Sequence, residues 1–313
     1  MTASSAHHTG PVTLACPECG HVPLEASDAV LGCQACGRSW RQDSGLPLLL
    51  REKRDTYLAD ELTPEAAASL VASAEEVGWR AALPAVLRRL PAAQASYLEE
   101  YVCATSRALL TELLDAGEGD AVLDHGCGWG ALTCELARRV RTVAAMDLLP
   151  PRARFTAIRA RQEGLANVTT LASGDYRRLP FPDASFDAVV VNGVLEWVPT
   201  TIPGNPTKVQ TQRLSEVARV LRPGGRLLLA IENRYWWRYF LGRPEVHTWV
   251  RGAAIVPRAL ADLLARRKGH RCTTAPFATC PHSHRRQTVA CRPSIATDEY
   301  ACRCRYPGKL AWA

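Results

Sequence analysis

Apolar runs alternate with helical patterns along the second half of the chain. A short strand is predicted at residues 120–124, and the segment ALTCELARRV that follows a glycine-rich stretch has helical spacing of its apolar positions. Further strands are predicted at VAAMD, NVTTLAS, DAVVVN and RLLLAI, the fourth ending at Asn192, with a helix and a Pro-Gly-Gly turn before the fifth. Strand, glycine loop and helix form the first crossover of an α/β fold with a doubly wound, Rossmann-like sheet.

Residues 52–118 have the pattern of helices. Thr63-Pro64-Glu65 has the features of a helix start, namely a capping hydroxyl, a proline in the first turn and an early acid. A long amphipathic stretch runs from Ala92 to Leu114. These helices either cover a cleft or simply pack against the rest of the chain.

The composition is that of a globular protein. The chain has 313 residues, of which 47% are hydrophobic and 22% charged, and this length predicts two or three structural units. No apolar run approaches the length of a bilayer span. The start, MTASSAHHTGP, has neither a basic nor an apolar signal region, so we expect a cytoplasmic location.

The formal charge of +7 is concentrated at one end. Residues 266–313 hold ten basic and two acidic residues, whereas residues 1–265 hold 28 basic and 29 acidic ones. Because affinity for nucleic acid scales with the number of phosphates neutralised, the balanced body disfavours a nucleic-acid partner.

Two cysteine pairs lie near the N-terminus. Cys16 and Cys19 are followed, after thirteen residues, by Cys33 and Cys36, and a glycine comes directly after each pair. Four thiolates in two tight turns suit a closed tetrahedral Zn²⁺ site, which would supply much of the folding free energy of so short a segment. The alternatives are four unligated cysteines or a redox dithiol, and no βαβ pattern surrounds the pairs to support the second.

The second pair leads into GRSWRQDSGLPLLL, an aromatic, a turn and a Leu-rich strand. Residues 14–50 thereby resemble the zinc ribbons of the family that includes methyltransferase activator subunits, apart from an inserted Ser44 in the turn. The resemblance implies that the ribbon is a docking platform for a protein partner and not a catalyst.

Asp124 lies two positions before the first glycine of the loop Gly126-Cys127-Gly128-Trp129-Gly130. Free amides at a helix start attract a carboxylate or a phosphate, and GxGxxA here would also fit a dinucleotide fold. An acid beside the loop would repel a pyrophosphate, however. It suits the ammonium and sulfonium of S-adenosylmethionine.

The DxGxGxG pattern resembles motif I of class I methyltransferases, and residues 97–235 resemble the group that includes ubiquinone and menaquinone methyltransferases. The resemblance implies that Asp147, 23 residues beyond Asp124, accepts the ribose hydroxyls, and that Asp175 accepts from the adenine amino group with the next backbone amide on the ring. An NAD-binding fold is the alternative. The resemblance to class I methyltransferases implies that the cofactor-binding residues are Asp124, Gly126, Gly128, Gly130, Asp147, Leu148, Asp175, Tyr176 and Asn192.

The acceptor is indicated only weakly by the sequence. The segment after the fourth strand lacks the N/D-P-P-Y signature of enzymes that act on amide and adenine nitrogens. The string ENRYWWRYFLGRPEVHTWVRG resembles a bacterial subgroup found alongside glycosyltransferases, which implies a small-molecule, glycan or cell-envelope acceptor. His247 is a candidate general base, although a lone histidine is more often structural.

Two other functions fit the same pattern. One is an rRNA or tRNA methyltransferase whose zinc ribbon is a substrate module. The other is a cofactor-binding scaffold without catalysis, whose ribbon recruits a second enzyme.

The sequence divides into four predicted parts. Residues 1–51 form the zinc ribbon, 52–118 a helical connector, 119–265 the methyltransferase domain, and 266–313 a basic tail rich in cysteine and arginine. The tail offers no convincing paired apolar strands to complete the sheet. It is predicted to be disordered or the product of a frameshift.

Overall fold

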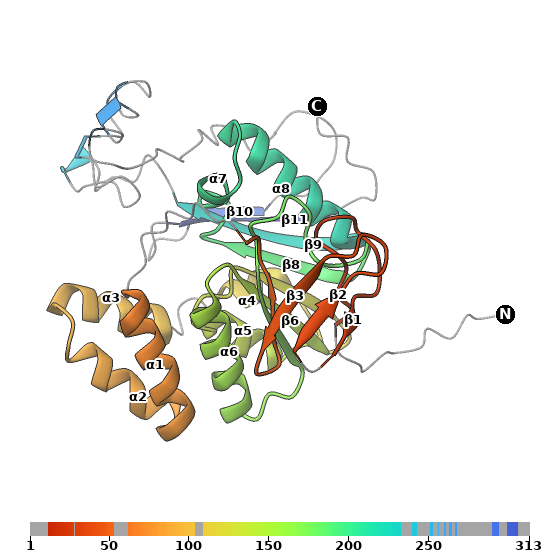
Figure 1. Cartoon of the computed structure of the whole chain (residues 1–313). Coiled ribbons are helices and arrows are strands. Elements are labelled where there is room, and N and C mark those ends of the chain that lie inside the picture. The colour runs from red at the N-terminus through yellow and green to blue at the C-terminus, as the bar shows by residue number, and fades with distance from the viewer. Residues whose placement is uncertain are drawn as a thin grey trace.

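Figure 1 shows the computed structural model of the chain. The helices and strands keep one numbering along the chain, from β1 and α1 onward. The structure describes residues 12–27, 29–52, 62–103, 109–232, 240–242, 251–252, 256, 260, 263–264, 267, 290–293 and 299–305.

A parallel sheet forms the centre of the structure, with strands in the order β7-β6-β5-β8-β9. Each neighbouring pair in this order is parallel. The chain runs outward from β5 to one side and then to the other, so the predicted doubly wound α/β fold is confirmed. The strands are β5 (Ala121–His125), β6 (Thr142–Asp147), β7 (Val168–Ser173), β8 (Phe186–Asn192) and β9 (Leu221–Glu232).

Helices cover both faces of this sheet (Figure 1). On one face, α4 (Leu109–Leu114) and α5 (Ala131–Ala137) pack on Val122, and α6 (Pro150–Gln162) lies beside α5. On the other face, α8 (Pro206–Val220) packs on Leu123, and the short α7 (Val198–Thr201) lies against α8. Successive residues of β5 thus face opposite layers, which explains why the strand reads as a continuous apolar run.

The connector contains the predicted helices. α1 (Pro64–Val77) begins where expected, because the Thr63 hydroxyl accepts a hydrogen bond from the Ala66 amide at 3.3 Å. α2 (Trp79–Leu87) and α3 (Ala92–Cys103) follow. The predicted stretch to Leu114 is occupied by α3 and α4, and residues 104–108 between them lie outside the described residues.

One side chain of α6 ties the connector to the sheet domain. Gln162 donates to the Ala74 carbonyl at 2.8 Å and accepts from the Trp79 amide at 2.8 Å, so it joins the end of α1 to the start of α2. Phe155 of α6 is fully buried and meets both Trp79 and Trp129 edge-on. This aromatic cluster makes the connector part of the same folded body.

The N-terminal cysteine segment forms four antiparallel strands that continue the central sheet. These are β1 (Glu25–Ala26), β2 (Val30–Gly32), β3 (Ser39–Asp43) and β4 (Leu46–Leu49), each paired with the next. β4 also pairs in parallel with β7, through Leu48 with Ala172 and Leu49 with Ser173. Trp40, Cys16 and Cys33 belong to the same buried cluster as the sheet strands.

The inserted Ser44 is accommodated in the turn between β3 and β4. Ser44 and Gly45 have φ values of 46° and 78°, the left-handed conformation that a two-residue hairpin needs at both positions. The Ser44 carbonyl accepts from the Arg154 guanidinium of α6 at 3.1 Å. The turn therefore fixes the ribbon to α6 as well as to β7.

The tail contributes two strands to the sheet, although its sequence holds no convincing paired apolar strands. β11 (Glu299–Arg305) pairs antiparallel with β9, and β10 (Ala290–Pro293) pairs antiparallel with β11. Strands pair through their backbone amides and carbonyls. β11 can therefore pair with the apolar β9 without being an apolar run itself. The remaining tail residues, and the question of a frameshift, lie outside what the structure describes.

In the part of the chain that the structure describes, no helix is both long and apolar enough to cross a membrane.

The Phe155 cluster yields a stability prediction. Phe155→Ala is expected to lower the free energy of unfolding by about 3–5 kcal/mol, because a cavity would form between Trp79 and Trp129. Urea denaturation followed by circular dichroism measures this loss. Val77→Ala, at a position that is 58% exposed, serves as the control and should change stability by less than about 0.5 kcal/mol. A loss below 1 kcal/mol for Phe155→Ala would contradict the assigned cluster.

Candidate functional site

The glycine loop follows β5 directly and is tied to the end of β6. Gly126, Gly128 and Gly130 have φ values of 88°, 53° and 80°, which a side chain would disfavour. The amides of Gly126 and Cys127 both donate to the Met146 carbonyl, at 2.7 and 3.0 Å. A Cβ at Gly126 would lie 2.0 Å from Val194 Cγ2, so a side chain here would force Val194 or the loop to move.

Asp147 ends β6 and orients the loop with its side chain. Its Oδ2 accepts from the Gly128 amide and its Oδ1 from the Leu149 amide, both at 2.9 Å. The residue is 6% exposed. An ionised carboxylate accepts hydrogen bonds only, which is the chemistry that a ligand hydroxyl needs in a partner.

Asp124 is buried at the end of β5 and lines a pocket over the glycine loop. The residue is 1% exposed, and its Oδ2 accepts a short hydrogen bond of 2.6 Å from the Thr133 hydroxyl of α5. Asn192, at the end of β8, lines the same pocket. A negative charge at this depth favours a cationic ligand group, because the surrounding protein screens it less than water does.

Two aromatic side chains of the pocket were missed by the sequence analysis. Tyr101 of α3 contributes to the lining, and its hydroxyl lies so close to the loop that a Cβ on Gly128 would be 2.4 Å away. Trp129, inside the loop itself, is 1% exposed and lines the pocket as well. The amphipathic stretch from Ala92 indicated a helix here, but nothing in its spacing indicated that α3 lies over the loop.

A second turn, Gly174-Asp175-Tyr176, follows β7 at the same edge of the sheet. Arg213 of α8 is 1% exposed and donates to the carbonyls of Gly174 at 2.9 Å and Tyr176 at 2.7 Å. Burial lowers the pKa of Arg213 to about 10, so the guanidinium remains charged at neutral pH. No pattern in the sequence indicated this contact, because Arg213 lies on a helix with other polar residues.

The ribbon holds both side chains of this turn. Asp175 Oδ2 accepts from the Arg51 amide at 3.0 Å, and the Tyr176 hydroxyl accepts from Trp40 Nε1 at 3.2 Å. Asp175 and Tyr176 are 2% and 8% exposed. The turn thus has its backbone fixed from α8 and its side chains fixed from the ribbon.

His125 lies between Asp124 and Gly126 but is buried away from solvent. Burial, with a further contribution from the charge of Arg213, holds the pKa of His125 well below its usual value. The imidazole is therefore neutral at physiological pH. Because the ring is also shielded from solvent, it is poorly placed to pass a proton between solvent and the site.

The structure brings most of the predicted cofactor residues to one edge of the sheet. Asp124, Gly126 and Asn192 line the pocket, and Asp147 contacts the loop. Leu148 follows β6 and lies opposite Gly174, with 3.8 Å between its Cβ and a Cβ built on the glycine. His247 lies outside the described residues, so the structure does not place the candidate base.

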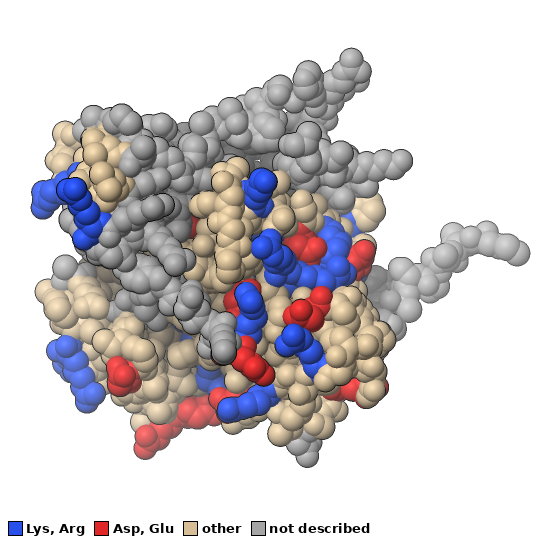
Figure 2. All heavy atoms as spheres, turned by 45° about the horizontal axis from the view of Figure 1, so that its top comes forward, with Lys and Arg blue, Asp and Glu red and all other residues tan. Residues whose placement is uncertain are grey.

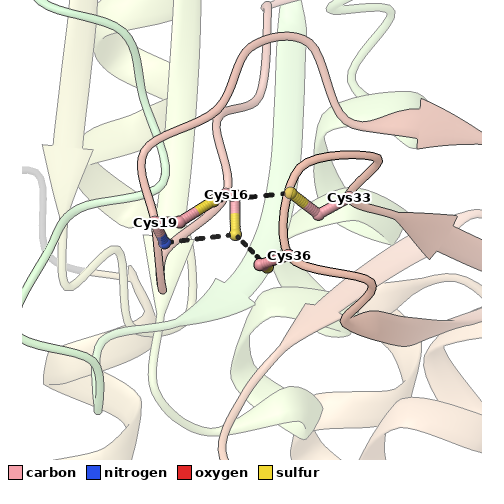
Figure 3. A group of neighbouring side chains, drawn as sticks. All are labelled: Cys16, Cys19, Cys33 and Cys36. Atoms are coloured by element: carbon pink, nitrogen blue, oxygen red, sulfur yellow. Dashed lines mark hydrogen bonds between the residues drawn. The ribbon is translucent and has the colours of Figure 1, made fainter.

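The four N-terminal cysteines converge as predicted (Figure 3). Their sulfur atoms all lie within 4.8 Å of one another, with Sγ distances of 3.7 Å from Cys16 to Cys36 and 3.5 Å from Cys19 to Cys33. A tetrahedral Zn²⁺ with bonds of about 2.3 Å places its sulfurs about 3.8 Å apart. The geometry of the thiols therefore fits this metal.

Two matched turns present these thiols. The Gly20 amide donates to the Cys16 carbonyl and the Gly37 amide to the Cys33 carbonyl, both at 2.9 Å. Both glycines have positive φ, 82° and 69°. The glycines expected after each cysteine pair thus serve the same purpose in both turns.

Comparison with known proteins decides the family. The model of a methyltransferase domain matches residues 123–229. The methyltransferase GfsG of Streptomyces halstedii is 37% identical over 122 residues, 39% of this chain and 41% of that protein. The demethylmenaquinone methyltransferase of Tropheryma whipplei (strain Twist) is 36% identical over 124 residues, 39% of this chain and 46% of that protein.

A longer match comes from Mycobacterium bovis, whose uncharacterized methyltransferase Mb3374 is 33% identical over 201 residues, 56% of this chain and 75% of that protein. The chain belongs to the class I S-adenosylmethionine-dependent methyltransferases. The predicted resemblance to class I methyltransferases is thereby confirmed. The part of this methyltransferase that aligns with the first two relatives spans less than half of the length of each.

The crowded glycine loop of this methyltransferase yields a second prediction. Gly126→Ala is expected to lower the free energy of unfolding by about 2–4 kcal/mol, from the left-handed φ and from the overlap with Val194. Urea denaturation measures the loss. The double variant Gly126→Ala/Val194→Ala should be more stable than Gly126→Ala alone, because it removes the overlap with Val194. It should stay less stable than the wild type, because the strain in φ at position 126 remains.

Gly119→Ala is the matched control, since a Cβ there meets no atom within 4 Å and its φ is not in the left-handed region. Equal stability of the Gly126→Ala and Gly119→Ala variants would show that the loop does not follow the described path.

Proposed function

We propose that the protein transfers the methyl group of S-adenosylmethionine to a small-molecule or glycan acceptor. The observation that carries the proposal is the pair of buried carboxylates, Asp124 and Asp147, on either side of the glycine loop. Family membership supports the cofactor, and the pocket at the carboxyl edge of the sheet supports its location.

The residues of the site suit the parts of this cofactor. The buried charge of Asp124 favours the cationic amino-acid end, and the carboxylate of Asp147 is an acceptor suited to the ribose hydroxyls. Asp175 and Tyr176, in the turn after β7, are assigned to the adenine. When bound, the cofactor supplies an activated methyl group on its sulfonium.

The protein contributes alignment and exclusion of water. Methyl transfer from a sulfonium is an in-line displacement, so the position of the acceptor relative to the methyl carbon dominates the rate. Tyr101 and Trp129 provide apolar walls over the loop, which would keep water from the reacting atoms.

A small-molecule acceptor is supported by the relatives and by charge. Demethylmenaquinone methyltransferase acts, by its name, on a small molecule. On the face shown in Figure 2, basic side chains are interspersed with acidic ones. Among the described residues, Arg219 pairs with Asp183 and Arg222 with Asp187. Such a mixed surface does not favour a polyphosphate chain.

We also propose that residues 1–51 bind one structural Zn²⁺ through Cys16, Cys19, Cys33 and Cys36. The fit of the sulfur distances to a tetrahedral site supports this metal. Cys16 and Cys33 are buried, whereas Cys19 and Cys36 are exposed. Burial raises the pKa of the Cys16 thiol to about 12. A metal ion would hold that sulfur as a thiolate.

The cofactor proposal is tested by calorimetry with S-adenosylhomocysteine, the product form of the cofactor. Asp124→Asn is expected to weaken binding roughly ten- to hundredfold, since a buried charge-assisted contact is worth about 1.5–3 kcal/mol. Glu75→Gln, on the exposed surface of α1, is the control and should bind as the wild type does. Unchanged affinity of Asp124→Asn, or tighter binding of NADH than of S-adenosylhomocysteine, would refute the assignment.

The metal proposal is tested by elemental analysis of the purified chain. One zinc per chain is expected, and Cys33→Ser/Cys36→Ser should contain little zinc and melt at a lower temperature, because metal binding stabilises the folded state. Cys103→Ser changes an exposed cysteine outside the cluster and should keep both the zinc and the Tm. Full zinc content in the double variant would disprove the ligand set.

A further inference from the structure

β4, the last strand of the ribbon, ends at the carboxyl edge of the sheet, where the glycine loop lies. β4 pairs with β7 in parallel, so the carboxyl ends of both strands lie at the same edge as the glycine loop. Arg51 follows β4 by two residues, and Asp175 follows β7 by two residues. The two chain segments therefore meet at this edge of the sheet, where the Arg51 amide donates to Asp175.

Both side chains of the turn after β7 have ribbon groups as hydrogen-bond donors. The Arg51 amide donates to Asp175 at 3.0 Å, and the Trp40 indole donates to the Tyr176 hydroxyl at 3.2 Å. The Trp40 and Tyr176 rings also meet edge-on, with 6.2 Å between centroids. Trp40 is only 5% exposed, so this contact is shielded from water.

Trp40 is linked to the cysteine cluster through short backbone connections. It lies on β3, where it pairs with Leu31 of β2, and the turn between these strands contains Cys33 and Cys36. The Cys33 amide also donates to the Arg38 carbonyl at 2.8 Å. A metal that fixes this turn therefore fixes the position of the indole.

The other cysteine turn packs on the chain just after Tyr176. The Ala15 amide donates to the Pro180 carbonyl at 3.0 Å. A Cβ on Gly20 would lie 2.8 Å from the Arg178 guanidinium carbon, so the arginine rests directly on the turn. Both halves of the cysteine cluster thus adjoin the segment that carries Asp175 and Tyr176.

We propose that the ribbon is a positioning element of the cofactor site, in which Trp40 and the Arg51 amide hold the Asp175–Tyr176 turn for the adenosine end of S-adenosylmethionine. This inference rests on the proposed cofactor and metal. It makes affinity for the cofactor depend on the metal in the ribbon, although the pocket lining includes none of the four ribbon cysteines. Trp40 is a positioning residue and takes no part in the chemistry.

The test compares two ligands by calorimetry on the zinc-loaded full chain. One is S-adenosylhomocysteine, and the other is 5′-methylthioadenosine, which lacks the amino-acid end. Trp40→Phe keeps an aromatic ring and removes the donor to Tyr176. It should raise the Kd for both ligands by the same factor, about two- to tenfold, the value of one hydrogen bond. Asp124→Asn should weaken only S-adenosylhomocysteine.

Four further samples separate positioning from general destabilisation. Tyr176→Phe should match Trp40→Phe, and the double variant should be no weaker than either, because both changes remove the same bond. Phe186→Leu alters a buried ring at the amino end of β8, the opposite edge of the sheet. It should lower the Tm and leave both Kd values unchanged. Chelator-treated wild type, at a temperature where circular dichroism shows it folded, should lose affinity for both ligands.

A Trp40→Phe variant with a lowered Tm and wild-type affinity for both ligands would overturn the inference. So would metal-free folded protein that binds both ligands as the zinc form does. If metal removal unfolds the chain, the zinc-loaded Trp40→Phe variant decides alone. A wild-type chain that binds neither ligand would instead overturn the proposed function.

Discussion

The parallel register of β6, β5 and β8 determines where the polar side chains of the site lie. Asp147, Asp124 and Asn192 are far apart in sequence, yet each stands at or near the carboxyl end of its strand, so pairing in register brings them to one edge. The loop amides then find the Asp147 carboxylate and the Met146 carbonyl beside them. Without this register the glycine loop would lack partners for its amides, and the pocket would not form.

Local patterns in the sequence predicted the central fold and the parts of the site that follow strands directly. Asp124 with the three glycines, and the four cysteines, form short motifs whose spacing along the chain is visible in the sequence. Trp40 and Tyr176 are 136 positions apart, and no periodicity links them. Tyr101, Arg213 and the antiparallel β11 were missed for the same reason, since each acts through a tertiary contact or through backbone groups alone.

Three parts of the chain contact the loops at the carboxyl edge of the sheet, and each does so in a different way. α8 holds the backbone of the turn after β7 through the buried Arg213, a charged donor that keeps both carbonyls satisfied. The connector covers the glycine loop with Tyr101. The ribbon supplies an amide and an indole. A site assembled from such distant segments can form only once the whole chain has folded, which distinguishes it from a motif grafted on one loop.

The pairing of β4 with β7 has a consequence for the outer edge of the sheet. β7 would otherwise present unpaired backbone amides and carbonyls along its free side, and exposed edges of this kind promote pairing between molecules. The ribbon occupies that side near the carboxyl end of β7 and turns away into short antiparallel strands, ending in the two-residue β1. The cysteine-bearing segment thereby reduces self-association through this edge. If the segment unfolded, the backbone groups of β7 would be exposed and could pair with another molecule.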